Sequence, residues 1–153
     1  MKSVIVYSSV HHGNTAKVAR AMADELGAVL VKTGETPPEA LEVYDLIGFG
    51  SGIYFGSHHK ALFALVDSLP AMKGKKAFIF STSGRGGPGF HRRLKETLLA
   101  KDFLVVGEFS CKGFDTYSLL KLFGGINKGR PDQDDLREAG LFARRLVEQN
   151  GQR

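Results

Sequence analysis

The stretch Lys2–Leu26, KSVIVYSSVHHGNTAKVARAMADEL, decides the fold. Its first part, Lys2–Ser8, is an apolar run rich in β-branched residues, which favours a strand. From Asn14 to Leu26 the apolar residues recur on one helical face, which predicts an amphipathic helix. Asn14 is a good N-cap for that helix and Gly27 a good C-terminal stop. The stretch therefore predicts a strand, a loop and a helix, the unit from which parallel sheets are built.

The same alternation continues along the chain. It predicts strands at Ala28–Lys32, Tyr44–Ser51, Lys75–Thr82 and Phe103–Cys111, and helices at Lys60–Leu69, Phe90–Lys101 and Asp134–Glu148. Apolar strands that alternate with amphipathic helices indicate a parallel sheet covered on both faces. We expect one domain over residues 1–153, an α/β three-layer fold whose doubly wound sheet has five parallel strands in the order 2-1-3-4-5. Such sheets bind ligands at the carboxyl ends of the strands, where strands 1 and 3 meet.

Composition and charge exclude several functions. The 153 residues are 42% hydrophobic, enough for a sizeable core. Cys111, the single cysteine, excludes an internal disulfide framework and a multi-cysteine metal site within one chain. The sequence shows no leader-like segment and no run long enough to span a membrane, so we expect a cytoplasmic protein without a membrane span.

The net charge of +5 raises the question of a nucleic-acid partner. The basic residues form separate pairs rather than a run, and no aromatic-rich RNA-binding motif accompanies them, so we do not expect nucleic-acid binding. A basic face that meets an acidic protein partner is the favoured interpretation.

The loops that follow three of the strands are rich in Gly, Ser and Thr. The loop after the first strand, Ser8–Thr15, combines a helix N-terminus with side-chain donors, which suits an anion. It lacks the Gly-Lys-Ser/Thr of a nucleoside-triphosphate loop, and helix capping alone is an equal alternative. After the third strand, Tyr54 and Phe55 lie between glycines, where a planar ring could stack or where the pair could simply pack on the next helix. The loop after the fourth strand offers many backbone groups and little bulk, so it suits a flat ligand edge or is a flexible turn.

Together these loops resemble those of the flavodoxin family, short-chain type, over nearly the whole chain. Gly13-Asn14-Thr15 is similar to the family's Thr-Gly-Asn-Thr phosphate signature, with His12 in place of the first threonine and a loop one residue longer. Gly50–Gly56 resembles the loop that covers one flavin face, and Thr82–Gly89 the loop that holds the pyrimidine edge.

The resemblance implies FMN as cofactor and electron transfer between redox partners as function. It implies that the cofactor is bound by Ser8, Ser9, His11, His12, Gly13, Asn14, Thr15, Ser51, Gly52, Ile53, Tyr54, Phe55, Gly56, Thr82, Ser83, Gly84, Gly86, Gly89 and Phe90. It assigns no catalytic residue. The peptide of Gly56 is the candidate acceptor for the proton on the reduced flavin.

The histidine pairs depart from the family pattern. Ser57-His58-His59 stands where ordinary flavodoxins carry carboxylates, and His11-His12 precedes the phosphate signature. Adjacent histidines rarely face one ion, and no carboxylate is interleaved, so we expect no metal. One member of each pair is expected at the cofactor: His11 or His12 at the phosphate, and His58 or His59 where it tunes the flavin or passes protons.

Residues 112–132 form an unusually long connection, with Ser118–Phe123 as a possible short helix. Its aromatic and basic residues are expected to cover the flavin, to meet a partner such as an acidic ferredoxin, or to pack against the fifth strand. We expect a monomer or a weak homodimer. Two other functions stay open: an FMN-dependent oxidoreductase acting on a quinone or porphyrinogen, which the Ser51–His59 loop also resembles, and a flavin-free interaction module.

Overall fold

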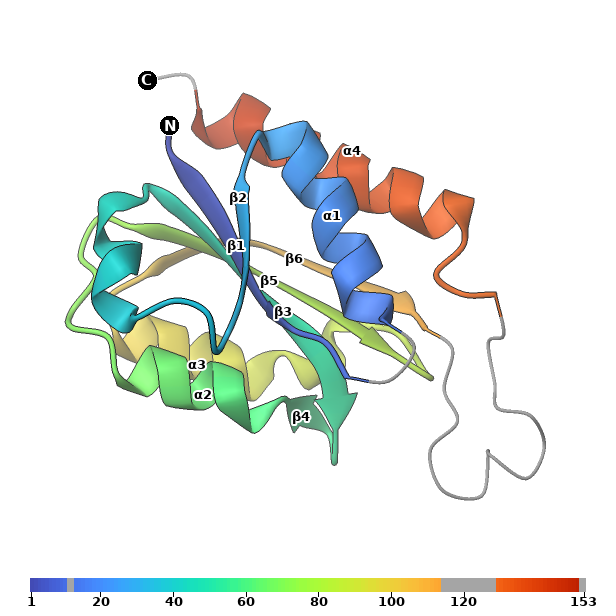
Figure 1. The fold of residues 1–153 in the computed structure, drawn as a ribbon, viewed down its shortest axis with the longest axis horizontal. Coiled ribbons are helices and arrows are strands. Elements are labelled where there is room, and N and C mark those ends of the chain that lie inside the picture. The colour runs from blue at the N-terminus through green and yellow to red at the C-terminus, as the bar shows by residue number, and fades with distance from the viewer. Residues whose placement is uncertain (11–12, 114–128, 152–153) are drawn as a thin grey trace.

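A computed structural model describes residues 1–10, 13–113 and 129–151. Helices and strands alternate through most of the chain (Figure 1). The strands are β1 (Ser3–Ser8), β2 (Val29–Lys32), β3 (Leu46–Tyr54), β4 (Ser57–His58), β5 (Lys76–Ser83) and β6 (Leu104–Lys112). The helices are α1 (Asn14–Leu26), α2 (Lys60–Asp67), α3 (Arg92–Ala100) and α4 (Gln133–Asn150), with 3₁₀ turns at Pro38–Val43 and Pro88–Phe90.

The sheet has the expected order. Its path is β2-β1-β3-β5-β6, which in chain order of the five parallel strands is 2-1-3-4-5. β4 is an additional short strand that pairs antiparallel with β3. The three-layer α/β fold predicted from the alternation of strands and helices is therefore confirmed.

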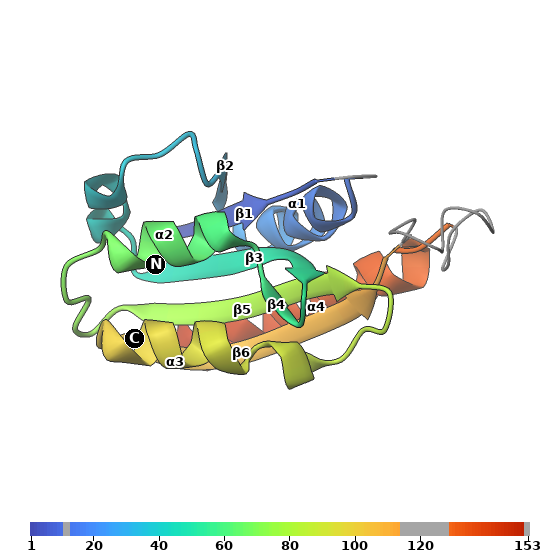
Figure 2. The same cartoon turned by 90° about the horizontal axis from the view of Figure 1, so that it is seen from below.

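Helices cover both faces of the sheet. α1 and α4 lie side by side on one face, and α2 and α3 lie on the other (Figures 1 and 2). Each face has its own apolar core, one built around Met22, Phe78 and Phe142 and the other around Phe49, Leu62 and Leu94. Within the described ranges, no helix combines the length and apolarity that a membrane-spanning segment needs.

Two glycines let β3 approach the aromatic residues of β5. A Cβ on Gly48 would stand 2.3 Å from Cζ of Phe78, and a Cβ on Gly50 would stand 2.2 Å from Cζ of Phe80. No real Cβ makes such a contact, so both rings occupy space that only glycine leaves open. The Phe80 residue packed in this way also accepts a hydrogen bond from His58 through its carbonyl.

Several element boundaries differ from the predicted ones. β3 continues through Tyr54 rather than ending at Ser51, because its last residues pair with β4. The N-cap of α1 is Gly13, and Asn14 is the first helical residue. α3 begins at Arg92, while Phe90 lies in the preceding 3₁₀ turn. The possible helix at 118–123 lies outside the described residues.

Candidate functional site

Three loops meet at the carboxyl edge of the sheet, where β1, β3 and β5 end next to one another. A direct hydrogen bond joins the first to the third, because the Thr15 and Thr82 hydroxyls lie 2.9 Å apart. Both side chains are buried. This bond ties the start of α1 to the end of β5, so the hydroxyl of Thr15 already has a partner. Its backbone N–H, in the first turn of α1, is the donor that it can offer to a ligand.

The N-terminus of α1 has the character of an anion site. Its N-cap, Gly13, adopts a left-handed conformation with φ of 65°, and the described residues include neither a side-chain cap nor an acidic side chain in the first turn. Ser9 Oγ accepts a long hydrogen bond from the Ala16 N–H in this turn, at 3.4 Å. In contrast, Asp132 and Asp135 form a complete capping box at α4. Within the part of the chain that the structure describes, the α1 amides therefore carry their partial positive charge without an acidic side chain in their own first turn.

The other residues expected at the phosphate are placed around this N-terminus. Ser8 is buried at the end of β1, and Ser9 follows it. The Asn14 side chain lies against Gly113 after β6, since a Cβ there would stand 2.6 Å from Asn14 Nδ2. His11 and His12, also expected here, lie outside the described residues.

The residues expected at the flavin ring form a hairpin rather than a loop. Ser51, Gly52, Ile53 and Tyr54 belong to β3, and a two-residue turn at Phe55-Gly56 leads into β4. Tyr54 bends back over the strand, because a Cβ on Gly52 would stand 3.1 Å from the Tyr54 hydroxyl oxygen. Partial burial of the Tyr54 phenol raises its pKa, so the ring is neutral at pH 7. The hairpin thus presents two aromatic rings on a backbone held by antiparallel pairing.

Phe55 has a strained backbone. Its φ is 52° and that of Gly56 is 80°, the pattern of a type I′ turn, in which Asn-Gly is the favoured pair. A bulky side chain is costly in this region of φ. We expect Phe55→Asn to raise the free energy of unfolding by roughly 0.5–1 kcal/mol, measured by urea denaturation. A loss of stability would contradict the strain argument. If the same variant keeps the wild-type affinity for FMN, Tyr54 rather than Phe55 is the ring that stacks on the cofactor.

The third loop is organised by its own backbone. Ser83 Oγ accepts from the Gly86 N–H at 2.9 Å, and the Ser83 carbonyl accepts from the Gly113 N–H at 3.0 Å. Gly86 has a φ of 69°, which only glycine adopts readily. Of the remaining residues expected here, Gly84 lies within this turn, and Gly89 and Phe90 lie between it and α3. The loop therefore begins with a compact turn that is bonded to the end of β6.

The two histidines of the hairpin have different environments. The His58 ring is buried and turned inward, where its Nε2–H donates to the Phe80 carbonyl at 2.9 Å. The His59 ring is half-buried at the start of α2, where Nδ1 accepts from the Ala61 N–H. Of the two rings, only that of His59 contacts the Tyr54 ring. A group bound beside Tyr54 could therefore be influenced by His59 and not by His58.

A polar network that joins β5, β6 and α3 around the buried residues Ser81 and His91 was not predicted. The His91 Nδ1–H donates to Glu108 at 3.1 Å, and its Nε2 accepts from the Ser81 hydroxyl at 2.6 Å. Lys95 donates to the other Glu108 oxygen at 3.2 Å. Burial lowers the pKa of His91, while Glu108 partly offsets that effect. A serine, a histidine and a carboxylate in this order resemble a hydrolytic triad, but Ser81 and His91 are fully buried. The network instead anchors the start of α3 to β5 and β6.

The sequence contains a pattern of serines that could have indicated part of this network. Serines end the apolar runs of four strands, and the register places Ser8, Ser51, Ser81 and Ser110 in one row across the sheet. A row of hydroxyls at the carboxyl edge marks where the core gives way to polar groups. The histidines that meet this row could not be assigned without the register.

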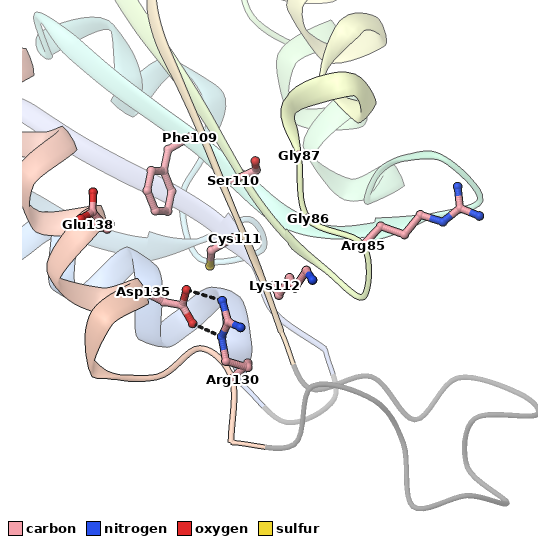
Figure 3. A pocket seen from close by; sticks show the side chains of 10 residues that line it. All are labelled: Arg85, Gly86, Gly87, Phe109, Ser110, Cys111, Lys112, Arg130, Asp135 and Glu138. Atoms are coloured by element: carbon pink, nitrogen blue, oxygen red, sulfur yellow. Dashed lines mark hydrogen bonds and ion pairs between the residues drawn. The ribbon is translucent and has the colours of Figure 1, made fainter.

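A cavity of about 430 Å³ lies beside the third loop, between β6 and the start of α4 (Figure 3). Arg130 spans its floor and pairs with Asp135, with Nη2 2.7 Å from Oδ1. The Cys111 thiol points toward this pair, and burial raises its pKa to about 12, so it stays protonated. Arg85 lines the cavity from the third loop, and its guanidinium end is well separated from the Arg130–Asp135 pair (Figure 3). The charged groups at the floor thus neutralise each other.

The fold brings the three loops together at the switch point of a doubly wound sheet, the place where sheets of this class bind ligands. A family model described as a flavodoxin domain matches residues 4–102. An uncharacterized protein of Methanocaldococcus jannaschii is 48% identical over 149 residues, covering 96% of this chain and 99% of the relative. The chain belongs to the flavodoxin family, whose members bind flavin, typically FMN.

Solved structures show the same fold at low identity. A flavodoxin from the domain Archaea superposes with a TM-score of 0.72 at 18% identity, covering 97% of this chain and 98% of that one. Flavodoxin 2 from Bacillus cereus gives 0.69 at 19%, covering 97% and 99%. Rubredoxin oxygen:oxidoreductase from Desulfovibrio gigas gives 0.71 at 17%, and the match covers 99% of this chain but 37% of that one.

Proposed function

We propose that this protein is an FMN-binding electron carrier that passes electrons between redox partners. The observation that carries the proposal is the N-terminus of α1 at the switch point of the sheet, whose amides have no carboxylate cap among residues 1–10, 13–113 and 129–151. A phosphate monoester is the anion that such an N-terminus suits. The Thr15–Thr82 hydrogen bond holds the start of α1 beside the third loop, which is the loop expected at the edge of a flat ring.

The residues present fit FMN in chemical type. The first-turn amides of α1 and the Ser9 hydroxyl would hold the phosphate. Tyr54 or Phe55 would stack on the flat ring, and the peptide groups between Ser83 and Gly86 would face its polar edge. FMN supplies the electron-transfer chemistry when bound, while this chain supplies binding, orientation and exclusion of water.

The test is the visible spectrum of the purified protein before and after incubation with FMN and removal of the excess. We expect retention of about one FMN per chain with quenched flavin fluorescence, and weaker binding of riboflavin, which lacks the phosphate. Stepwise one-electron reduction would support the carrier, whereas turnover with a quinone would favour the oxidoreductase. Failure to retain FMN at micromolar concentrations would overturn the proposal and favour a flavin-free module.

The partner we propose is an acidic redox protein. Arg85 and Lys112 are exposed beside the third loop, and in the described part of the chain neither side chain forms an ion pair. Both residues are among those that give the whole chain its net charge of +5. Association with an acidic ferredoxin would then weaken steeply as salt increases; an association rate independent of ionic strength would count against it.

A further inference from the structure

His59 joins three parts of the hairpin. Its Nδ1 accepts from the Ala61 N–H at 2.9 Å and so caps α2. Its own backbone N–H donates to Ser51 Oγ at 2.9 Å, and the Ser51 hydroxyl donates to the Gly52 carbonyl at 2.6 Å. The helix therefore fixes the imidazole, and the end of β3 fixes the backbone of the same residue.

The cap determines the protonation of the ring. Since Nδ1 must keep a lone pair to accept from Ala61, the single proton of the neutral imidazole is on Nε2. In this state the ring stands edge-on to Tyr54, with centroids 5.3 Å apart and planes at 88°. Tyr54 is thereby held between His59 and the open Cα of Gly52, where its hydroxyl end lies. An edge-to-face pair of this kind limits how far the phenol can turn.

We propose that His59 is a positioning residue of the cofactor site, which holds the Tyr54 ring in place while its imidazole is neutral and releases the ring when the imidazole is protonated. The proposal rests on the proposed function, because Tyr54 is one of the two rings expected to stack on FMN. It adds a regulation: retention of the cofactor becomes sensitive to pH through a residue that need not touch it.

Protonation disrupts the cap for two reasons. A second proton on Nδ1 would face the Ala61 N–H, which is also a donor, and the new positive charge would lie at the positive end of the α2 dipole. The groups around the ring do not compensate. Lys60 on α2 lowers the pKa of His59 further after the main effect of burial, Tyr54 on β3 is neutral, and His58 on β4 is neutral and turned inward. We therefore expect release below the ordinary imidazole pKa of 6.5.

Two variants separate the cap from the ring. His59→Asn keeps a side-chain acceptor that caps helices well, but it removes the ring that meets Tyr54. We expect H59N to keep the wild-type Tm while its FMN dissociation constant rises roughly two- to tenfold at pH 7.5. His59→Ala removes both functions and is expected to lower Tm as well. Between pH 7.5 and pH 5, FMN affinity should fall more steeply in the wild type than in H59N.

A measurement without FMN keeps this inference separate from the proposed function. NMR of the apoprotein should show the Tyr54 ring resonances shifting with the same midpoint as the His59 ring resonances during a pH titration. If wild-type protein does not bind FMN but this coupling is present, the positioning role stands and the cofactor assignment fails. Tyr54 resonances that do not follow His59, or an FMN affinity and pH profile unchanged in H59N, would overturn the inference, and the titration requires no variant to fold.

Discussion

Replacing Ser9 by Asp is expected to weaken FMN binding at least 100-fold while leaving riboflavin binding within about threefold of the wild type. Ser9 Oγ already accepts from an amide in the first turn of α1, at 3.4 Å from Ala16 N. A carboxylate at the same position would take the place proposed for the phosphate. At an effective dielectric constant of about 20, two unit charges about 4 Å apart repel by about 4 kcal/mol, so the penalty on a phosphate is of that order.

The same substitution has the opposite effect on the empty protein. The amides of α1 lack a carboxylate cap among the described residues, and an acidic side chain near a helix N-terminus stabilises it by about 0.3–1 kcal/mol. Ser9→Asp should therefore leave the free energy of unfolding unchanged or raise it slightly. A variant that binds FMN poorly because it has unfolded cannot show this combination.

Ser68→Asp provides the matched control. Ser68 is the exposed C-cap residue of α2 and lies at the far end of that helix from the hairpin. The Ser68→Asp substitution introduces the same charge away from the site, so the affinity for FMN should stay at the wild-type value. Isothermal titration of the wild type, S9D and S68D, each with FMN and with riboflavin, measures these affinities. An S9D protein that keeps FMN within threefold of the wild type would place the phosphate elsewhere.

The fold was predictable because its signals are local. The range predicted for α1, Asn14–Leu26, is the observed one, and its C-terminal end is as predicted, since the apolar period runs to Leu26 and Gly27 supplies the left-handed C-cap with φ of 64°. The order of the parallel strands follows from the alternation of strands and helices, with right-handed crossovers. Neither inference requires knowledge of which side chains touch.

The site was predictable only in part, because several of its features depend on pairing between distant segments. The end of β3 is rich in glycine and shows no alternation, so its extension to Tyr54 depends on pairing with the two-residue β4. Asn14 was expected as an N-cap, but Gly13 takes that position and the Asn14 side chain packs against Gly113, a contact far along the chain. The partner of His91 is Glu108, whose position depends on a register shift in the β5–β6 pairing.

Acid should destabilise the apoprotein through His58. Its ring is 3% exposed, and burial is the main cause that lowers its pKa from 6.5 to about 4. The bond to the Phe80 carbonyl occupies the proton on Nε2, and among the described residues Nδ1 has no hydrogen-bond partner. A second proton would therefore sit on a buried nitrogen without an acceptor, with His91 at a ring distance of 5.1 Å.

The sign of the effect follows from proton binding. Between pH 6.5 and pH 4 the unfolded chain binds a proton at His58 that the folded chain does not, so stability falls as the pH falls through this interval. The interval corresponds to roughly 3 kcal/mol lost from this residue alone. The pKa of His91 is lowered as well, so His91 adds a loss of stability of the same sign. The pH dependence of wild-type stability alone therefore does not separate the contribution of His58.

His58→Gln isolates the contribution. Glutamine can donate to the Phe80 carbonyl but does not titrate, so its pH dependence lacks the His58 proton. We expect the free energy of unfolding, from urea titrations at pH 4.5, 5.5, 6.5 and 7.5, to fall less steeply in H58Q than in the wild type, by about 1.4 kcal/mol per pH unit near pH 5. Equal m-values in the two proteins would show that both unfold from equally compact states. Parallel pH curves would mean that His58 takes up its proton in the folded protein, and therefore that the buried Nδ1 has an acceptor.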